Sequence, residues 1–225
     1  MSKILIPTNS PENWKTFLAE PDKQWKTGCS AKTLAYCWEE AIGFPSCVQS
    51  VFSEAGAPFT DLEPLLIIPE HQVPLPGGRR PSQNDIWVLA KSNNELVSIA
   101  VEGKVSEPFG PTLEEWMEKA SPGKKKRLDF LKNELGFKNN IPQNIRYQLL
   151  HRTASAIIEA KRFNASHAVM MVHSFSQTHE WFDDYKKFLQ LFNLGGSINL
   201  ISTTNVGNLE LHFAWIQGEA DYLGR

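Results

Sequence analysis

The sequence predicts one α/β domain, in which a mixed central sheet has helices on both sides. Residues 86–90 and 96–101 are apolar runs separated by the polar turn cluster 92–95, a pattern typical of a β-hairpin. The apolar run 168–172 and the stretch 209–216, in which apolar residues alternate, add strands after helical stretches. The expected order is therefore helices, strand, hairpin, helices, strand, helix, strand, over residues 1–225 as a single domain.

Composition narrows the class of protein. Of 225 residues, 41% are hydrophobic and 21% are charged, which is typical of a soluble globular chain. The net charge of −2 gives no global field for a nucleic-acid partner, so any basic surface must be local. No apolar run approaches the roughly 20 residues that span a bilayer. The apolar stretch among the first residues is too short for a signal peptide. We therefore expect a cytoplasmic protein with no membrane contact.

The cysteine count points to free thiols. The chain has three cysteines, an odd number, at Cys29, Cys37 and Cys47. Without a secretory signal this argues against disulfides. No Cys-x-x-Cys or Cys/His ligand spacing is present, which argues against a zinc site.

The first quarter of the chain, about residues 1–56, is expected to be helical. A helix start is predicted near residue 10. Ser30 is a suitable N-cap for a helix through about residue 42, and Gly43 closes it. Pro45 begins a further helix that ends near Gly56.

A short strand and a long loop precede the hairpin. Residues 65–68 are a buried-strand candidate, and residues 69–81 are a loop rich in proline and glycine. Arg79 and Arg80 in this loop have two interpretations. They contact a phosphate backbone, or they belong to an ordinary solvated loop.

Four helices are expected after the hairpin. Thr112 begins a capping box for the first, and the basic run 124–127 begins the second. Lys124 and Lys125 either contact nucleic acid or form a solvated helix face. The stretch 143–163 is the longest helical pattern. Another helix is predicted over residues 179–192.

The ends of the hairpin carry the candidate chemistry. Asp85 stands at the start of the first strand, with Glu102 and Lys104 at the end of the second. Pairing through the turn brings Asp85 close to Glu102, and alternation directs Glu102 and Lys104 to the same face. Two carboxylates about 4 Å apart repel by roughly 4 kcal/mol at a dielectric near 20. They either share a proton or bind a hard divalent cation.

A divalent cation, carboxylates and a lysine together make a site for phosphodiester hydrolysis. The pattern of an acidic residue followed two positions later by lysine, as in Glu102-Gly103-Lys104, has low specificity. It recurs as Glu159-Ala160-Lys161 and Asp184-Tyr185-Lys186. Both recurrences fall in helical patterns, whereas Glu102 follows a β-type run. The competing interpretation is a solvated Glu/Lys pair at an exposed strand end.

Asp85 followed by Glu102-Gly103-Lys104 resembles the signature of the PD-(D/E)XK nuclease superfamily. The segments 82–86 and 101–110, together with 146–152 and 173–176, are similar to an uncharacterised bacterial family placed in that superfamily. The resemblance covers most of the chain. It implies a restriction-endonuclease-like fold.

The resemblance also implies roles for individual residues. Asp85 and Glu102 would ligate Mg²⁺ or Mn²⁺, and Lys104 would orient or activate the attacking water. In parts of the superfamily an early helix supplies a further acid, for which Glu39 is the candidate. A solvated helix glutamate is the other interpretation of Glu39.

Some nucleases of this superfamily place a glutamine-bearing helix beside the catalytic hairpin. Gln148 and Arg152 are the candidates on the helix predicted over 143–163, with Arg152 also a candidate nucleic-acid contact. The neighbouring His151 is expected to be structural.

The sequence therefore predicts a metal-dependent nuclease acting on DNA or RNA. The alternative is a non-catalytic nucleic-acid-binding or protein-interaction module on the same fold. A third hypothesis, a cysteine hydrolase, pairs Cys29 or Cys37 with a histidine, although no family signature supports it. The oligomeric state stays open, a homodimer included.

Overall fold

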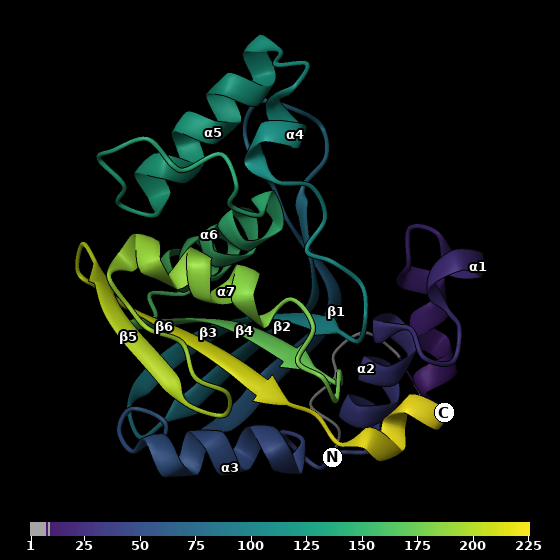
Figure 1. The fold of residues 1–225 in the computed structure, drawn as a ribbon. Helices are drawn as coiled ribbons and strands as arrows, with labels where there is room; N and C mark the ends of the chain where they lie inside the picture. The colour runs from purple at the N-terminus through teal and green to yellow at the C-terminus, as the bar shows by residue number, and fades with distance from the viewer. Residues whose placement is uncertain (1–7, 9) are drawn as a thin grey trace.

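A single mixed sheet of six strands organises the computed structural model, which describes residues 8 and 10–225 (Figure 1). Its strand order is β1-β2-β3-β4-β6-β5. The strands are β1 Glu63–Val73, β2 Ser82–Ser92, β3 Glu95–Lys104, β4 His167–Ser174, β5 Ile201–Val206 and β6 Leu209–Gln217. The first three are antiparallel, β3, β4 and β6 are parallel, and β5 is antiparallel to β6. The predicted α/β class with a mixed, helix-flanked sheet is confirmed.

The predicted hairpin is formed by β2 and β3. Ile86 pairs with Val101 at one end and Ser92 pairs with Glu95 at the turn. Both strands are almost entirely buried, because they lie in the middle of the sheet with packed side chains on each face.

Four helices are on one side of the sheet, two of them over the sheet itself and two beyond these (Figure 1). They are α4 Leu113–Met117, α5 Pro122–Glu134, α6 Tyr147–Arg162 and α7 Phe182–Leu189, the last continued by the short η2 Gln190–Phe192. The connection from β3 to the parallel β4 contains α6, as a parallel pair requires a crossover. The buried side of α6 packs Leu150, Ala154 and Ile157 into the core on this face.

Two longer N-terminal helices belong to the opposite face. They are α2 Ser30–Glu39 and α3 Ser46–Ala55. Trp38 and Phe52 from these helices pack with Phe59, and the interior strand residues Val88 and Ile99 complete this second core. The helix predicted through residue 42 ends at Glu39, so its predicted length was too great.

Shorter helices occur in the first and last parts of the described chain. They are η1 Pro11–Phe17, α1 Pro21–Gln24 and η3 Ala220–Gly224. Thr27 Oγ1 donates to the Arg225 carbonyl oxygen at 2.8 Å, so the segment between α1 and α2 lies beside Arg225. Among the described residues, none of the helices has the length and apolar character needed to cross a membrane.

The predicted loop before the hairpin differs from the structure. Strand β1 runs to Val73, well beyond the predicted 65–68, because Pro69 is tolerated on an edge strand. The remaining loop packs on the start of α5, where Arg127 Nε donates to the Pro76 carbonyl at 2.9 Å. A Cβ on Gly77 would lie 2.1 Å from the Gly123 carbonyl oxygen, so only glycine permits this contact. We call this unit, residues 74–81 with α4 and α5, the arm.

Candidate functional site

The hairpin brings Asp85, Glu102 and Lys104 together, as the sequence predicts. Lys104 Nζ lies 2.6 Å from Glu102 Oε1, and both side chains are almost fully buried. The Gly103 backbone N–H donates to Asp85 Oδ2 at 2.8 Å. The acid of β2 is therefore held directly against the strand that carries the other two groups.

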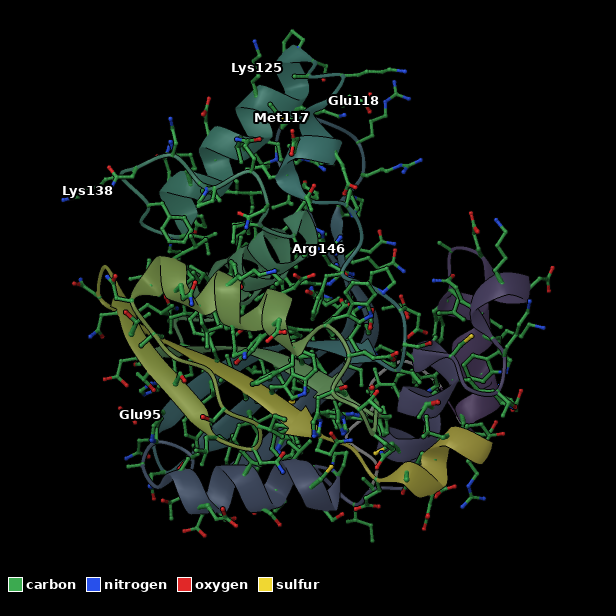
Figure 2. The ribbon with its side chains drawn as sticks, viewed as in Figure 1. Glu95, Met117, Glu118, Lys125, Lys138 and Arg146 are labelled. Atoms are coloured by element: carbon green, nitrogen blue, oxygen red, sulfur yellow. The ribbon has the colours of Figure 1, made fainter. Side chains whose placement is uncertain are left out.

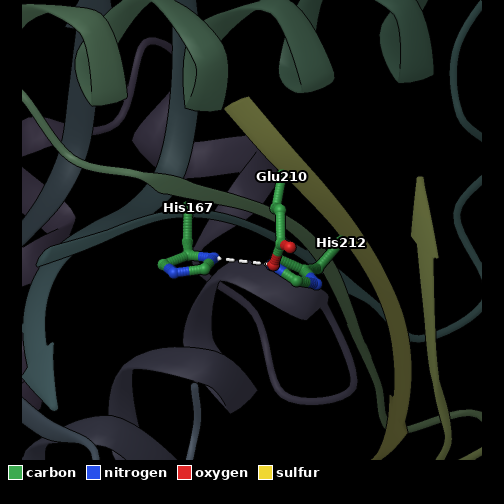
Figure 3. Close-up of side chains that lie close together, drawn as sticks. All are labelled: His167, Glu210 and His212. Atoms are coloured by element: carbon green, nitrogen blue, oxygen red, sulfur yellow. Dashed lines mark hydrogen bonds and ion pairs between the residues drawn. The ribbon is translucent and has the colours of Figure 1, made fainter. Parts of the chain in front are cut away.

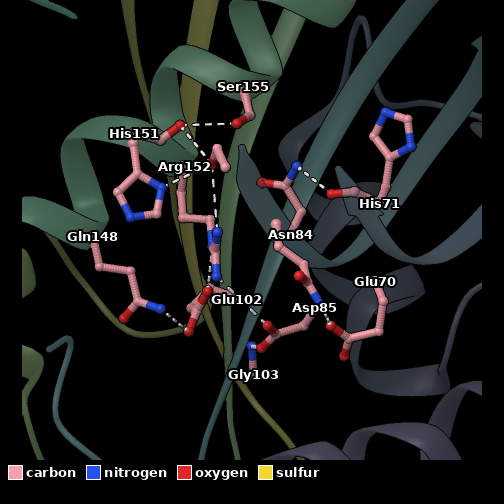
Figure 4. Close-up of polar contacts among 12 residues, drawn as sticks. Glu70, His71, Asn84, Asp85, Glu102, Gly103, Gln148, His151, Arg152 and Ser155 are labelled. Atoms are coloured by element: carbon pink, nitrogen blue, oxygen red, sulfur yellow. Dashed lines mark hydrogen bonds and ion pairs between the residues drawn. The ribbon is translucent and has the colours of Figure 1, made fainter. Parts of the chain in front are cut away.

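Helix α6 adds two further groups to the same cluster (Figure 4). Gln148 Nε2 donates to Glu102 Oε1 at 2.7 Å, and Arg152 Nε donates to Glu102 Oε2 at 2.5 Å. Arg152 Nη2 also lies 3.8 Å from Asp85 Oδ1. The predicted position of Gln148 beside the hairpin is thus observed.

Arg152 requires a correction. It was expected to contact nucleic acid, but it is only 7% exposed, and its guanidinium group lies against two carboxylates. Because its guanidinium charge is paired with two acids, Arg152 is not the free basic group that was expected, although it lines the cavity beside them. Its positive charge offsets part of the negative charge of the acidic cluster.

Glu70 is a third acid that the sequence analysis missed. It lies in β1 between Pro69 and His71, whose partners in β2 are Ile86 and Asn84, so the register sets it across from Asp85. Its carboxylate accepts from Gln83 Nε2 at 2.6 Å. Its φ of 52° is in the left-handed region, which is costly for a residue with a Cβ. Because residues 69–81 were predicted to be loop, no alternation could place Glu70 on this face.

Glu39 does not join the cluster, contrary to the expectation for an early-helix acid. It is the last residue of α2 and accepts from Trp14 Nε1 at 2.8 Å. The cavity at the acidic cluster is lined by Glu70 and not by Glu39. The additional acid therefore comes from an edge strand, because the end of α2 is turned toward the N-terminal segment.

The carboxyl groups respond to burial and to one another. Burial, followed by the charge of Glu102, raises the pKa of Asp85 to about 7. Burial, followed by the charge of Asp85, raises the pKa of Glu70 to about 8. Burial opposes ionisation of Glu102 as well, but Arg152 and Lys104 outweigh it and hold its pKa below the ordinary value. Near neutral pH, Glu102 is therefore ionised, whereas Asp85 and Glu70 are each protonated in part of the molecules.

A cavity of about 410 Å³ opens onto these groups. Its floor is made by the acids, Lys104, Gln148 and Arg152, and its rim includes Lys23 and Ser30 from the N-terminal helices. Glu107 also lines it and accepts from the Ser30 N–H at 2.7 Å, which fixes the start of α2 against the end of β3. The cluster is therefore buried on one side and reachable on the other.

The remaining predicted contact residues lie on the arm. Arg79, Arg80 and Lys125 are exposed. Lys124 is partly buried, and its Nζ donates to the Trp116 carbonyl oxygen at 2.6 Å. Figure 2 shows Lys125 at the outer end of the arm. The packing of the loop on α5 brings these two basic stretches, far apart in the sequence, onto one unit.

The three cysteines are free thiols, as predicted. The cysteine nearest a histidine is Cys47, not Cys29 or Cys37, with Sγ 3.4 Å from His173 Nε2. Hydrogen bonding to Cys37 and contact with His173 lower the pKa of Cys47 to about 5 against the effect of burial. His173 is fully buried, so a hydrolase substrate has no access to it.

Comparison with protein families identifies the chain as a member of a family described as a domain of unknown function (DUF6946), whose model matches residues 7–220. Comparisons with curated proteins and with solved structures found no match. The family assignment names no activity, so function must be argued from the acidic cluster.

The raised pKa values predict that the metal-free protein becomes less stable as pH rises from about 5 to about 8. Unfolded Asp and Glu lose their protons near pH 4, whereas folded Asp85 and Glu70 keep theirs until pH 7 to 8. The folded state then binds more protons, so the free energy of unfolding falls with pH. Glu70→Gln, which needs no proton, should flatten this fall by on the order of 1 kcal/mol per pH unit.

Urea denaturation at pH 5.5, 7 and 8.5 in the presence of a chelator measures the effect. Glu118→Gln, a change at an exposed glutamate outside the cluster, is the matched control. An unchanged pH slope in Glu70→Gln would show that Glu70 carries no proton in the folded protein.

Proposed function

We propose that this protein is a Mg²⁺-dependent nuclease that hydrolyses phosphodiester bonds of DNA or RNA. The observation that carries the proposal is the charge balance at the cavity. Among the described residues, the three acids Glu70, Asp85 and Glu102 lie with two buried cations, Lys104 and Arg152, while Lys23 is further out on the cavity rim. A proton on the groups whose pKa is raised neutralises the excess negative charge. A divalent cation can replace that proton.

The residues present fit a hard divalent cation. Asp85 and Glu70 offer carboxylate oxygens on adjacent strands, and Glu102 offers another if one of its hydrogen bonds opens. Gln148 Oε1 is buried and has no hydrogen-bond partner among the described residues, so a polar acceptor is also available there. Oxygen donors of this kind are what Mg²⁺ prefers.

Bound Mg²⁺ would polarise a phosphoryl oxygen and lower the pKa of a coordinated water. Lys104 is placed to hydrogen-bond and orient the attacking water, since its ammonium lies at the cavity beside Glu102. Arg152 holds Glu102 in one orientation through Nε and offsets the charge of Asp85. Its burial makes it a positioning residue in this scheme.

The arm supports a nucleic-acid substrate. A chain with a net charge of −2 has no overall attraction for phosphates, so contact needs a local basic surface. Arg79, Arg80 and Lys125 are exposed on the arm, which joins the sheet through β1 and β2, the strands that carry Glu70 and Asp85. The arm and the acidic cluster are therefore connected by two continuous strands, which would position a nucleic-acid backbone bound along the arm relative to the cluster.

One observation favours the alternative, a non-catalytic module. Arg152 already lies against both Asp85 and Glu102, in the manner of a permanent counterion. If it is never displaced from this position, the fold can bind nucleic acid or protein without hydrolysing phosphodiesters. The metal experiment below separates the two functions.

Divalent-dependent cleavage should be lost in Asp85→Asn, with the fold retained. Asparagine keeps the acceptor for the Gly103 N–H but removes the charge that a cation needs. We expect a rate loss of about 100-fold or more, as for other lost transition-state contacts. Lys104→Met should also lose rate, by on the order of 100-fold, while Mg²⁺ affinity changes little, because a protonated lysine is not a ligand.

The assay measures Mg²⁺-dependent cleavage of single- and double-stranded DNA and RNA by purified variants. Glu102→Gln is a poor test, because it takes the negative charge away from buried Lys104 and leaves Arg152 with Asp85 alone as its acidic partner. Cleavage at wild-type rate in Asp85→Asn would refute the assignment.

Mg²⁺ should stabilise the folded protein. At a hundredfold excess over its dissociation constant, a cation bound only to the folded state adds about 2.7 kcal/mol. For a chain of this size that is a rise of about 5–10 °C in Tm. The shift should grow from pH 6 to pH 8, because the protons on Asp85 and Glu70 compete with the metal.

Thermal melts with and without Mg²⁺ test this, with Asp85→Asn expected to show no shift. A Tm that Mg²⁺ leaves unchanged at pH 8, together with retained nucleic-acid binding, would support the non-catalytic module instead.

The double variant Arg79→Ala/Arg80→Ala should weaken binding to all nucleic-acid sequences about equally. Each lost phosphate contact should reduce the slope of log K against log salt by about 1. Lys138→Ala is the matched control, since Lys138 is exposed beyond the other end of α5 (Figure 2). Fluorescence anisotropy at several salt concentrations measures both quantities. Equal slopes for the double variant and wild type would exclude the arm as the phosphate contact.

A further inference from the structure

A second cluster of potential metal ligands lies at the other end of the sheet (Figure 3). It consists of His167 at the start of β4 with Glu210 and His212 in β6. The parallel register pairs His167 with Glu210, and the two-residue spacing puts Glu210 and His212 on one face. The three side chains therefore converge because of strand pairing, although 45 residues separate the two histidines.

The distances between the three facing atoms match a tetrahedral metal site. His167 Nδ1 lies 3.2 Å from His212 Nε2 and 3.2 Å from Glu210 Oε2. His212 Nε2 lies 3.8 Å from Glu210 Oε2. Ligands bound to Zn²⁺ at 2.0–2.1 Å in tetrahedral geometry are about 3.3 Å apart. A small movement of Glu210, whose side chain is 48% exposed, would equalise the triangle.

Both histidines are oriented by a hydrogen-bond partner on their outer nitrogen. His167 Nε2 lies 3.3 Å from Glu95 Oε2, and His212 Nδ1 lies 2.9 Å from Thr203 Oγ1. Metal-binding histidines characteristically carry such a partner, which selects the tautomer and aims the free nitrogen at the metal. Phe59 packs against the His212 ring with centroids 4.9 Å apart, so the ring is also fixed by its neighbours.

A cavity of about 320 Å³ adjoins the cluster, and Glu210, His212 and Thr203 line it. A metal held by three protein ligands there would have a fourth position open to solvent. Two histidines and one glutamate with an open position form a donor set that selects Zn²⁺ over Mg²⁺. The sequence argued against zinc only because no Cys/His spacing is present, and a ligand set split between two strands leaves no such spacing.

We propose that His167, Glu210 and His212 form a Zn²⁺-binding site that is separate from the acidic cluster. The two sites lie on opposite faces of the sheet. Glu102 faces α6, whereas His212 faces Phe59 and the core beneath α3. The site does not depend on the proposed nuclease activity, because no residue is shared.

Chelator-treated protein titrated with Co²⁺, a spectroscopic substitute for Zn²⁺, tests the site. We expect one equivalent to give the intense visible absorption of four-coordinate Co²⁺, and Zn²⁺ to displace it. His212→Asn should weaken binding 100-fold or more, because asparagine can keep the bond to Thr203 but lacks the Nε2 ligand. Glu210→Gln, at a half-exposed position that is safe for folding, should also abolish the four-coordinate spectrum.

Thr203→Val should weaken binding about 10- to 100-fold by freeing the His212 ring. Asp85→Asn should leave the Co²⁺ spectrum unchanged, so this test is distinguishable from the nuclease test. The proposal is overturned if folded wild-type protein gives no four-coordinate spectrum. It is equally overturned if the spectrum persists in both His212→Asn and Glu210→Gln, since the metal would then be bound elsewhere.

Discussion

The buried carboxylate of Glu102 is the group around which the acidic cluster of this fold is arranged. A carboxylate that is 3% exposed must be matched by charge and hydrogen bonds, or it would be protonated. Lys104 supplies charge from its own strand, whereas Gln148 and Arg152 supply contacts from α6. These contacts tie the hairpin to the crossover helix, so the orientation of α6 and the ionisation of Glu102 depend on each other.

Asp85 and Glu70 have weaker partners than Glu102, although all three acids belong to the same cluster. Arg152 Nη2 reaches Asp85 only at 3.8 Å, and Glu70 has the neutral Gln83 as its hydrogen-bond partner. Burial therefore raises their pKa values with little opposition, whereas Arg152 and Lys104 hold the pKa of Glu102 below its ordinary value. Carboxyl groups with pKa values pushed apart in one cavity are characteristic of functional sites, although ion-pair networks also produce them. The left-handed backbone at Glu70 is a second, independent feature that is characteristic of functional sites. Such strain persists only where the surrounding structure imposes it.

The parallel part of the sheet explains how one domain can carry two unrelated clusters. Strands β3 and β4 begin near His167 and end near Glu102 and Lys104, with His167 opposite Val97 and Lys104 opposite Ser174. Polar residues at the two ends of these strands are thus separated by the length of a buried strand. The apolar middle, including Val101 and Val169, insulates one cluster from the other. A change at either end need not disturb its counterpart.

The sequence by itself determined the parts of this protein that depend on local pattern. The alternation and the turn cluster predicted the hairpin, and with it the meeting of Asp85, Glu102 and Lys104. The helical pattern over 143–163 predicted α6, and the resemblance to the nuclease superfamily pointed to Gln148 on it, whose side chain contacts Glu102. Capping chemistry correctly predicted the start of α4, where Thr112 and Glu115 form a capping box.

Only the tertiary structure decided the groups whose partners are distant in the chain. Glu70 was missed because strand pairing, not local propensity, extends β1 through proline-rich sequence, and Glu39 was chosen because nothing local shows where a helix end points. Arg152 was expected to contact nucleic acid, and its pairing with Asp85 and Glu102 was not foreseen because it depends on the packing of α6 against the hairpin. His167, Glu210 and His212 meet only through the pairing of β4 with β6. Long-range pairing has no short-range signal, since the energy of a contact depends on distance in space and not on separation along the chain.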